Sequence, residues 1–195
     1  MNKAYMAAIC EAARNPDKVR LGPSPRALLA LMRTRGYAQI TVTDICREAD
    51  IPRRTFYHYF DSKEAVLRAV VESMLNECFL EVMLEFDRGF DVMQDGLVRN
   101  FRYWQGKARE KLDLLLGNGL SGEMMQCALH WLESEHLGLP HRPGVSDKEL
   151  ELITMVGCSG FFTLLMYWRR NNYRETPEEM ANFAMQVLSE PLFPH

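Results

Sequence analysis

Helix-start signals recur along this chain and restrict it to a helical fold. Four residue pairs have the spacing of a capping box, in which a Ser, Thr or Asp side chain caps a helix and an acidic residue three positions on reaches back. These pairs are Thr41 with Asp44, Asp61 with Glu64, Ser146 with Glu149, and Thr176 with Glu179. No alternating run of β-branched residues is long enough for a convincing strand. The sequence therefore predicts an all-α protein.

Apolar spacing between these starts defines the expected helices. Ser24 and Pro25 open a further helix, which Gly36 closes, and Pro177 stands at a first-turn position. The expected ranges are 4–14, 25–35, 42–49, 52–58, 62–87, 91–104, 107–117, 122–137, 147–171 and 177–189. The run from 152 to 168 is the most membrane-like, but it is shorter than the roughly 20 residues of a usual span and carries polar residues. We expect a buried helix there and no membrane association.

Composition and charge indicate a folded protein with two unlike parts. The chain has 195 residues, of which 47% are hydrophobic and 25% charged, as is usual for globular proteins. Residues 1–68 hold 12 Lys and Arg against 7 Asp and Glu, a balance of +5, whereas residues 69–195 hold 11 against 19, a balance of −8. A basic amino-terminal part on an acidic body suits a polyanionic partner at one end.

Cysteine usage indicates the compartment. Five cysteines form no CxxC pair and are odd in number, which is typical of buried thiols in a reducing cytosol: Cys10, Cys46, Cys78, Cys127 and Cys158. The apolar run at the amino terminus is short and Glu11 interrupts the residues after it, so we expect no export signal. A cytoplasmic location is the resulting expectation.

Residues 25–60 have the layout of a helix-turn-helix: a helix, a short second helix, a tight turn at 49–51 and another short helix. Apolar residues of this segment are expected to pack inward, namely Ile45, Ala49, Ile51, Phe56 and Phe60 against Leu28, Leu31 and Tyr37. Polar residues are left on or near the other surface: Arg53, Arg54, Thr55, Tyr57 and His58. Arginines near the amino end of such a helix suit guanine edges in the major groove, and Pro52 provides no side-chain cap. The segment predicts DNA binding.

The motifs RGY, ITVTDI, REA, TFYHYF and SKEAVL follow one another within residues 26–71, and this segment resembles the DNA-binding domain of TetR-type transcriptional regulators. The run GCSGFFTLLMYWRRNNYRETPEEMA is similar to the end of one subgroup. The resemblance implies phosphate contacts from Thr41, Thr43 and Lys63. It implies base or backbone contacts from Arg53, Arg54, Thr55, Tyr57 and His58. Three positions depart from the family pattern: Asp50 replaces a usual Gly, Pro52 a usual Ser or Thr, and Arg54 a small residue.

The resemblance divides the chain into an extension at 1–20, a helix-turn-helix domain at 21–68 and a helical regulatory and dimerisation domain at 69–195. It implies a homodimer on a palindromic site, more often a repressor than an activator, and a small-molecule pocket in the body. Candidate pocket residues are Met83, Phe101, Trp104, Met125 and Phe162, for which packed core is the alternative. Candidate dimer-interface residues are Gly157, Gly160, Leu164 and Trp168.

Other functions have weaker support in the sequence. His130, Glu133 and His136 have helical spacing for a metal site, but i and i+6 point to different sides of a helix, so a solvated face is favoured. No HExxH, Walker, dinucleotide or nucleophile-elbow motif occurs, and we expect neither enzyme activity nor a cofactor. The remaining alternative is a protein-interaction module that keeps the helix-turn-helix fold.

Overall fold

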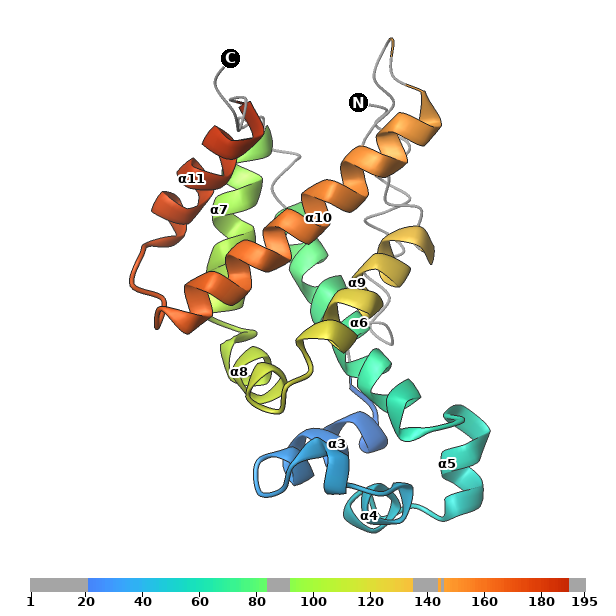
Figure 1. Cartoon of the computed structure of the whole chain (residues 1–195). Coiled ribbons are helices and arrows are strands. Elements are labelled where there is room, and N and C mark those ends of the chain that lie inside the picture. Colours follow the sequence, from blue (N-terminus) through green and yellow to red (C-terminus); the bar gives the residue numbers. More distant parts are fainter. Residues whose placement is uncertain (1–20, 84–91, 135–143, 145, 190–195) are drawn as a thin grey trace.

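The computed structural model describes residues 21–83, 92–134, 144 and 146–189, and within them it contains helices and no strand. The helices are α3 (Pro23–Met32), α4 (Val42–Glu48), α5 (Arg53–Tyr59), α6 (Lys63–Met83), α7 (Val92–Gln105), α8 (Arg109–Gly117), α9 (Ser121–Ser134), α10 (Asp147–Arg170) and α11 (Pro177–Ser189), with one 3-10 turn, η1 (Tyr37–Gln39). The predicted all-α class is confirmed, and the ranges agree closely with those expected from apolar spacing (Figure 1). The expected helix at 4–14 lies outside the described residues.

Local capping interactions account for the starts of α4, α10 and α11. The Thr41 hydroxyl accepts a hydrogen bond from the N–H of Asp44, and the Asp44 carboxylate accepts one from the N–H of Thr41. The same reciprocal pair joins Ser146 to Glu149. Thr176 and Glu179 make it too, and α11 begins at Pro177 as predicted. Three of the predicted capping boxes are therefore confirmed.

The fourth predicted box, Asp61 with Glu64, is wrong by one residue. Helix α6 begins at Lys63, and the Ser62 hydroxyl accepts a 3.2 Å hydrogen bond from the N–H of Ala65. Both Asp61 and Ser62 are good capping residues, so the local pattern does not decide between them. In the structure Ser62 is the residue whose side chain caps α6.

The first helix also begins and ends earlier than predicted. Helix α3 starts at Pro23, because the fixed φ of proline suits a first helical position. It ends at Met32 rather than continuing to 35. The Thr34 hydroxyl donates a 3.1 Å hydrogen bond to the carbonyl of Leu31 and so takes up one of the last helical acceptors.

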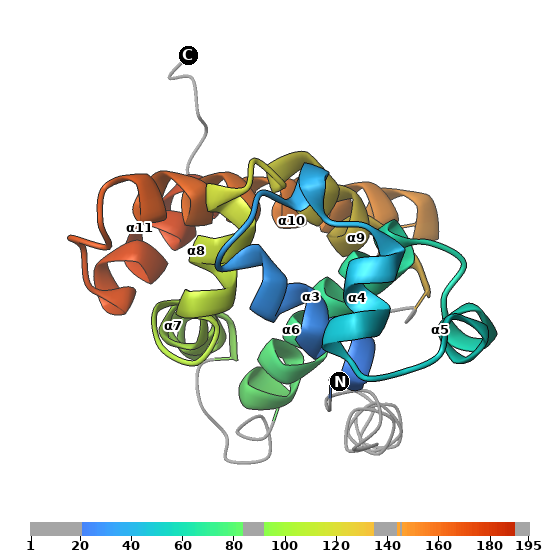
Figure 2. The same ribbon diagram turned by 90° about the horizontal axis from the view of Figure 1, so that it is seen from below.

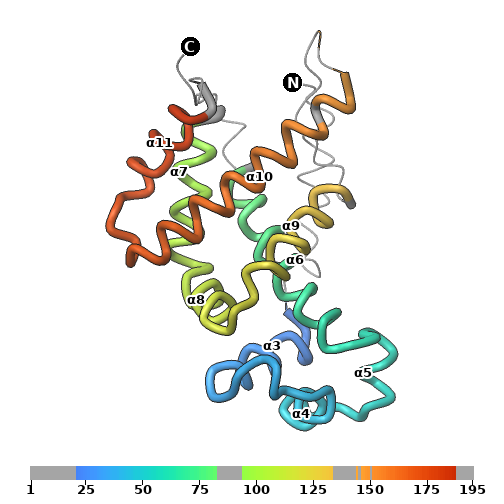
Figure 3. The backbone as a smooth tube through the Cα atoms, in the orientation of Figure 1, coloured from blue at the N-terminus to red at the C-terminus, as the bar shows by residue number. Residues whose placement is uncertain are grey.

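Helices α3, α4 and α5 gather at one end of the molecule, around the start of α6 (Figures 1 and 2). Helix α6 then runs into the body, where α7 and α9 pack along it and α11 packs along α7. The tube view shows that α6 is continuous through the predicted domain boundary at residue 68 (Figure 3). A shift of the body can therefore reach the helix-turn-helix through α6.

Both ends of the molecule have apolar cores. Leu28, Ile45 and Phe56 are fully buried in the helix-turn-helix, with Val66 and Val70 of α6 behind them, as the inward-facing pattern predicted. Each such side chain contributes about 1.5–3 kcal/mol by leaving water. In the body the core is an aromatic cluster made of Phe101, Trp104, Phe161, Phe162, Trp168 and Tyr173.

Helix α10 corrects one expectation. The sequence predicts a buried helix over 152–168, yet Leu152, Ile153 and Val156 are 51%, 46% and 71% exposed. The opposite side, with Phe162 and Leu165, is buried against the chain. The hydrophobic residues of α10 thus cover two sides, and only one of these sides packs against the part of the chain that the structure describes. Among the described helices, α10 is long and apolar enough to cross a membrane by length and composition alone.

Candidate nucleic-acid interface

The turn between α4 and α5 is built by a residue in the left-handed conformation. Asp50 has φ 51°, the N–H of Ile51 bonds to the carbonyl of Cys46 at 3.0 Å, and the N–H of Asp50 bonds to the carbonyl of Arg47. This is a Schellman ending, which usually has Gly at the left-handed position. Asp tolerates that conformation better than most residues. The predicted turn therefore forms with Asp50 in place of the usual Gly, and it directs the chain into α5.

Helix α5 begins without a side-chain cap, because its N-cap residue is Pro52. One residue of its seven, Phe56, is buried, at 0% exposure. All the other positions of α5 are exposed to solvent: Arg53, Arg54, Thr55, Tyr57, His58 and Tyr59. The predicted outward set is therefore on the surface.

Arg53 joins the two helices of the motif. Its guanidinium donates to the Thr43 hydroxyl on α4 and to the Tyr57 hydroxyl on α5, each over 3.3 Å. The same guanidinium lies 5.8 Å from the centre of the Tyr57 ring. Three of the predicted DNA-binding residues thus form one connected group on the surface. We refer to Thr43, Arg53 and Tyr57 as the Arg53 cluster.

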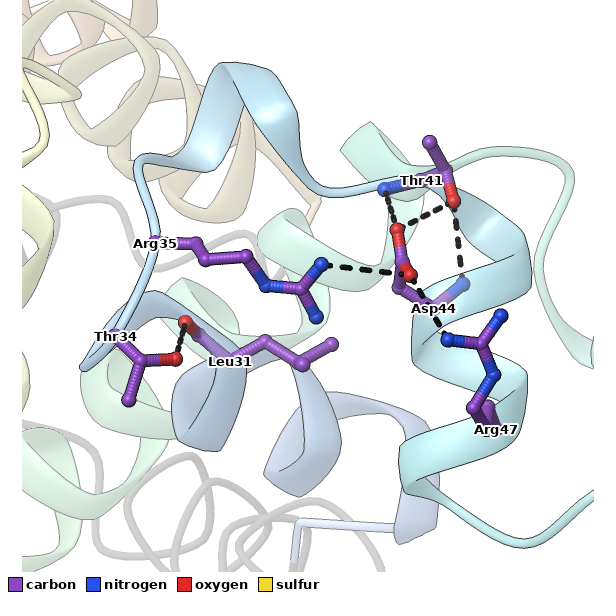
Figure 4. Close-up of polar contacts among 6 residues, drawn as sticks. All are labelled: Leu31, Thr34, Arg35, Thr41, Asp44 and Arg47. Carbon is purple, nitrogen blue, oxygen red and sulfur yellow. Dashed lines mark hydrogen bonds and ion pairs between the residues drawn. The ribbon is translucent and has the colours of Figure 1, made fainter.

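Two further arginines pair with Asp44 in the first turn of α4, and the sequence pattern did not single them out. Asp44, whose carboxylate is already bonded to Thr41, also pairs with Arg35 at 3.5 Å and Arg47 at 3.6 Å (Figure 4). The hydrogen bonds from the side chain and the backbone of Thr41 lower the pKa of Asp44, and Arg35 adds to this shift. Arg47 could have been suspected from its i,i+3 spacing to Asp44, whereas Arg35 lies on another element.

Lys63 is turned inward rather than fully toward solvent. Its ammonium donates to the carbonyl of Tyr37 over 3.0 Å and lies 4.4 Å from the centre of the Tyr37 ring. The N–H of Tyr37 in turn donates to the side-chain oxygen of Asn118, after α8, over 2.7 Å. Arg33 pairs with Glu110 of α8 at 2.7 Å. These contacts join the helix-turn-helix to the body, and nothing in the sequence pattern indicates them.

The candidate pocket residues lie in the core of the body. Phe101, Trp104 and Phe162 are at most 4% exposed and belong to the aromatic cluster, with Trp104 and Phe162 ring centres 6.3 Å apart. Met125 on α9 is half-buried. The side chain of Met83 lies outside the described residues. Three of the five are therefore together, as filled core.

The candidate interface residues share one side of α10 but differ in burial. A Cβ added at Gly157 or Gly160 would meet no atom within 4 Å, and Leu164 is half-buried. Trp168 is fully buried in its own chain, and its indole N–H donates to the carbonyl of Glu175 over 2.9 Å. The candidate metal residues are not brought together in the described part of the chain: His130 and Glu133 are exposed on α9, and His136 lies outside it.

Residues 26–70 match the family model for bacterial regulatory proteins of the tetR family. This comparison supports the helix-turn-helix interpretation of the segment. The transcriptional regulator EthR of Mycolicibacterium smegmatis is 39% identical over 61 residues, or 31% of this chain and 24% of that protein. EthR of Mycobacterium tuberculosis is 33% identical over 69 residues, or 35% of this chain and 32% of that one. The dhaKLM operon activator DhaS of Lactococcus lactis is 42% identical over 48 residues, or 25% of this chain and 26% of that one.

The match to these relatives spans only about a quarter to a third of their length. The whole fold resembles the crystal structure of Thermus thermophilus FadR, a TetR-family repressor in complex with lauroyl-CoA. The TM-score is 0.54 with 21% identity, over 89% of this chain and 95% of that one. At this identity the likeness is one of fold. Residues 26–70 therefore match the tetR family of bacterial regulatory proteins, and the chain as a whole shares the fold of a TetR-family structure.

Proposed function

We propose that this protein is a cytoplasmic, homodimeric transcriptional repressor that binds a palindromic DNA operator and is released by a small-molecule effector. The Arg53 cluster is the observation that carries the proposal. It joins the start of α4 to α5 on the surface, where a helix-turn-helix crosses the DNA backbone with its first helix and enters the major groove with its second. Thr41, Arg54, Thr55 and His58 extend the same exposed surface.

Dimer formation is supported by exposed hydrophobic residues on the last two helices. Leu152, Ile153, Val156 and Tyr167 on α10 and Phe183 and Val187 on α11 are between 36% and 71% exposed. Gly157 and Gly160 lie open beside them, so a second helix can approach closely. We propose Gly157, Gly160 and Leu164 with these residues as the interface. The buried Trp168 supports α10 from inside.

A second copy explains the exposed side of α10 better than a lipid bilayer does. The exposed apolar residues of α10 occupy one side, while Phe162, Leu165 and Trp168 are buried among the described residues on the other. An isologous two-fold contact buries such a one-sided stripe fully. It also supplies two recognition helices, which a palindromic site requires.

Effector release is proposed to act through the contacts between body and helix-turn-helix. A ligand that binds one arrangement of the body more tightly shifts the population toward it. The contact from Tyr37 to Asn118, the pair of Arg33 with Glu110 and the continuous helix α6 would carry such a shift to α4 and α5. The solved FadR structure contains lauroyl-CoA, so acyl-CoA thioesters are the first probes to try.

To test the proposal, the purified protein is mixed with a library of random DNA duplexes, and the duplexes that it binds are recovered and sequenced. The affinity for the most enriched duplex is then measured at several salt concentrations. A palindromic consensus with a steep salt dependence is expected, because several phosphates are neutralised in each half-site. Arg53→Glu with Arg54→Glu should abolish selection. If the wild-type protein enriches no sequence, with and without acyl-CoA, the regulator is contradicted and a protein-interaction module is favoured.

A further inference from the structure

Helix α5 presents its exposed side chains in three different directions. Successive residues are about 100° apart around an α-helix, so Arg54 and His58 lie within about 20° of the direction opposite the buried Phe56. Arg53 and Tyr57 lie on one flank of this ridge, and Thr55 and Tyr59 on the other. The ridge of Arg54 and His58 therefore projects farthest from the protein.

The flank that holds Arg53 faces α4. The Arg53 guanidinium donates to Thr43 on α4 and to Tyr57 one turn along α5, so this side chain already has partners before DNA binds. The start of α4 lies beside the DNA backbone in a helix-turn-helix complex. A guanidinium has five donors, and two of the Arg53 donors are used in these bonds. The remaining donors are available to a phosphate of the DNA backbone.

Arg54 has a different environment from its neighbour. In the part of the chain that the structure describes, no side chain forms a hydrogen bond or ion pair with it. Its guanidinium is exposed, is free to choose a partner, and sits at the amino end of the ridge. A planar guanidinium in that position can donate two hydrogen bonds to O6 and N7 of one guanine.

We propose that Arg53 and Arg54, the adjacent arginines of α5, have different roles in DNA recognition. Arg54, with His58 beside it on the ridge, specifies a guanine in each half-site, whereas the Arg53 cluster fixes the docking position on the phosphate backbone. This inference rests on the proposed function as a DNA-binding dimer. It predicts which base position depends on which side chain, because phosphate contacts carry no direct sequence information.

The test repeats the duplex selection in parallel with wild-type protein, Arg53→Ala and Arg54→Ala. Arg174→Ala is the matched control, since it removes an exposed arginine from the segment between α10 and α11. For Arg54→Ala we expect the palindrome to remain while one guanine position in each half-site accepts any base. On duplexes altered only at that position, wild-type affinity should fall roughly 10- to 100-fold per half-site, and Arg54→Ala affinity should change less than about two-fold.

For Arg53→Ala we expect the wild-type consensus with weaker binding to every sequence, and a salt slope smaller by about 0.9 for each phosphate that is no longer neutralised. Circular dichroism of both variants checks that the fold is kept. An unchanged consensus from Arg54→Ala, or a consensus base lost only from Arg53→Ala, overturns the division. Failure of the wild-type protein to select any sequence overturns the proposed function instead, and with it this inference.

Discussion

The backbone N–H of Tyr37 donates a 2.7 Å hydrogen bond to the side-chain oxygen of Asn118, a residue 81 positions later in the chain. The amide nitrogen of Asn118 donates to the carbonyl of Leu114, which holds the side chain in that orientation. The carbonyl of Tyr37 accepts from Lys63 at the start of α6. One residue of the helix-turn-helix is thus held both by the body and by the helix that connects to it.

Replacing Asn118 by Ala should weaken this connection. The Tyr37 N–H would lose its partner, and an unsatisfied, partly buried donor costs about 1–3 kcal/mol. Urea unfolding of the variant measures the loss. Asn182→Ala is the control, because Asn182 accepts from Gln94 on the exposed surface between α7 and α11. A control as destabilised as Asn118→Ala would show that the contact has no special role.

The same variant should separate effector binding from DNA release. If an effector acts through the turn after α8, Asn118→Ala should bind it normally but lose at least part of its effect on operator affinity. Titration of effector against protein, and then against the protein–operator complex, gives the two affinities. If the effector lowers operator affinity equally in wild type and variant, its effect is transmitted through α6 and not through the Asn118 contact.

Position 50 offers a prediction about stability alone. Asp50 adopts φ 51°, which disfavours residues with a Cβ, so Asp50→Gly should stabilise the protein by up to about 1 kcal/mol. Asp50→Val should destabilise it by about 1–2 kcal/mol, because β-branched residues fit the left-handed region least well. Thermal unfolding of the two variants measures both effects. Equal stability of Val and Gly would mean that the turn relaxes to another conformation.

Acid should weaken the start of α4. The hydrogen bonds from Thr41 lower the pKa of Asp44 from its ordinary value of 3.8. A carboxyl with a depressed folded-state pKa stabilises the fold above its unfolded pKa, and this contribution is lost as the pH falls through the folded value. Stability measured from pH 7 to pH 2.5 should therefore fall less steeply below about pH 4 in Asp44→Asn than in wild type.

Thr41→Ala provides the matched test of the cause. Removing the hydroxyl deletes the largest contribution to the Asp44 shift, so the pKa of Asp44 should rise toward its ordinary value. Carboxyl carbon chemical shifts followed by NMR report this pKa directly. An Asp44 titration that is the same in wild type and Thr41→Ala would rule out the cap as the cause.

A charge placed on the exposed side of α10 should prevent dimer formation. Val156 is 71% exposed in the single chain and lies on the proposed interface. Val156→Glu should leave the chain folded but shift it to monomer, since an unpaired charge at a hydrophobic interface costs several kcal/mol. Sedimentation equilibrium measures the change, with Gln126→Glu on α9 as the control for added charge. A dimeric Val156→Glu protein would place the interface elsewhere.

The sequence by itself determined where helices begin and which side of each short helix faces inward. Capping boxes and the Schellman turn involve residues three to five positions apart, so a local pattern such as Thr41 with Asp44 carries the information. The burial of Ile45 and Phe56 followed from the same short-range spacing. Asp61 and Ser62 are both suitable capping residues, and there the local pattern predicted the wrong one.

Only the tertiary structure decided which side chains meet across the chain. Arg53 and Arg54 look equivalent in the sequence, but the approach of α4 gives a partner to Arg53 alone. The contact of Tyr37 with Asn118, the burial of Trp168 and the exposed side of α10 likewise depend on how distant helices pack. Local spacing fixes the direction of a side chain on its own helix, whereas its partner is fixed by chain segments that come close only after folding.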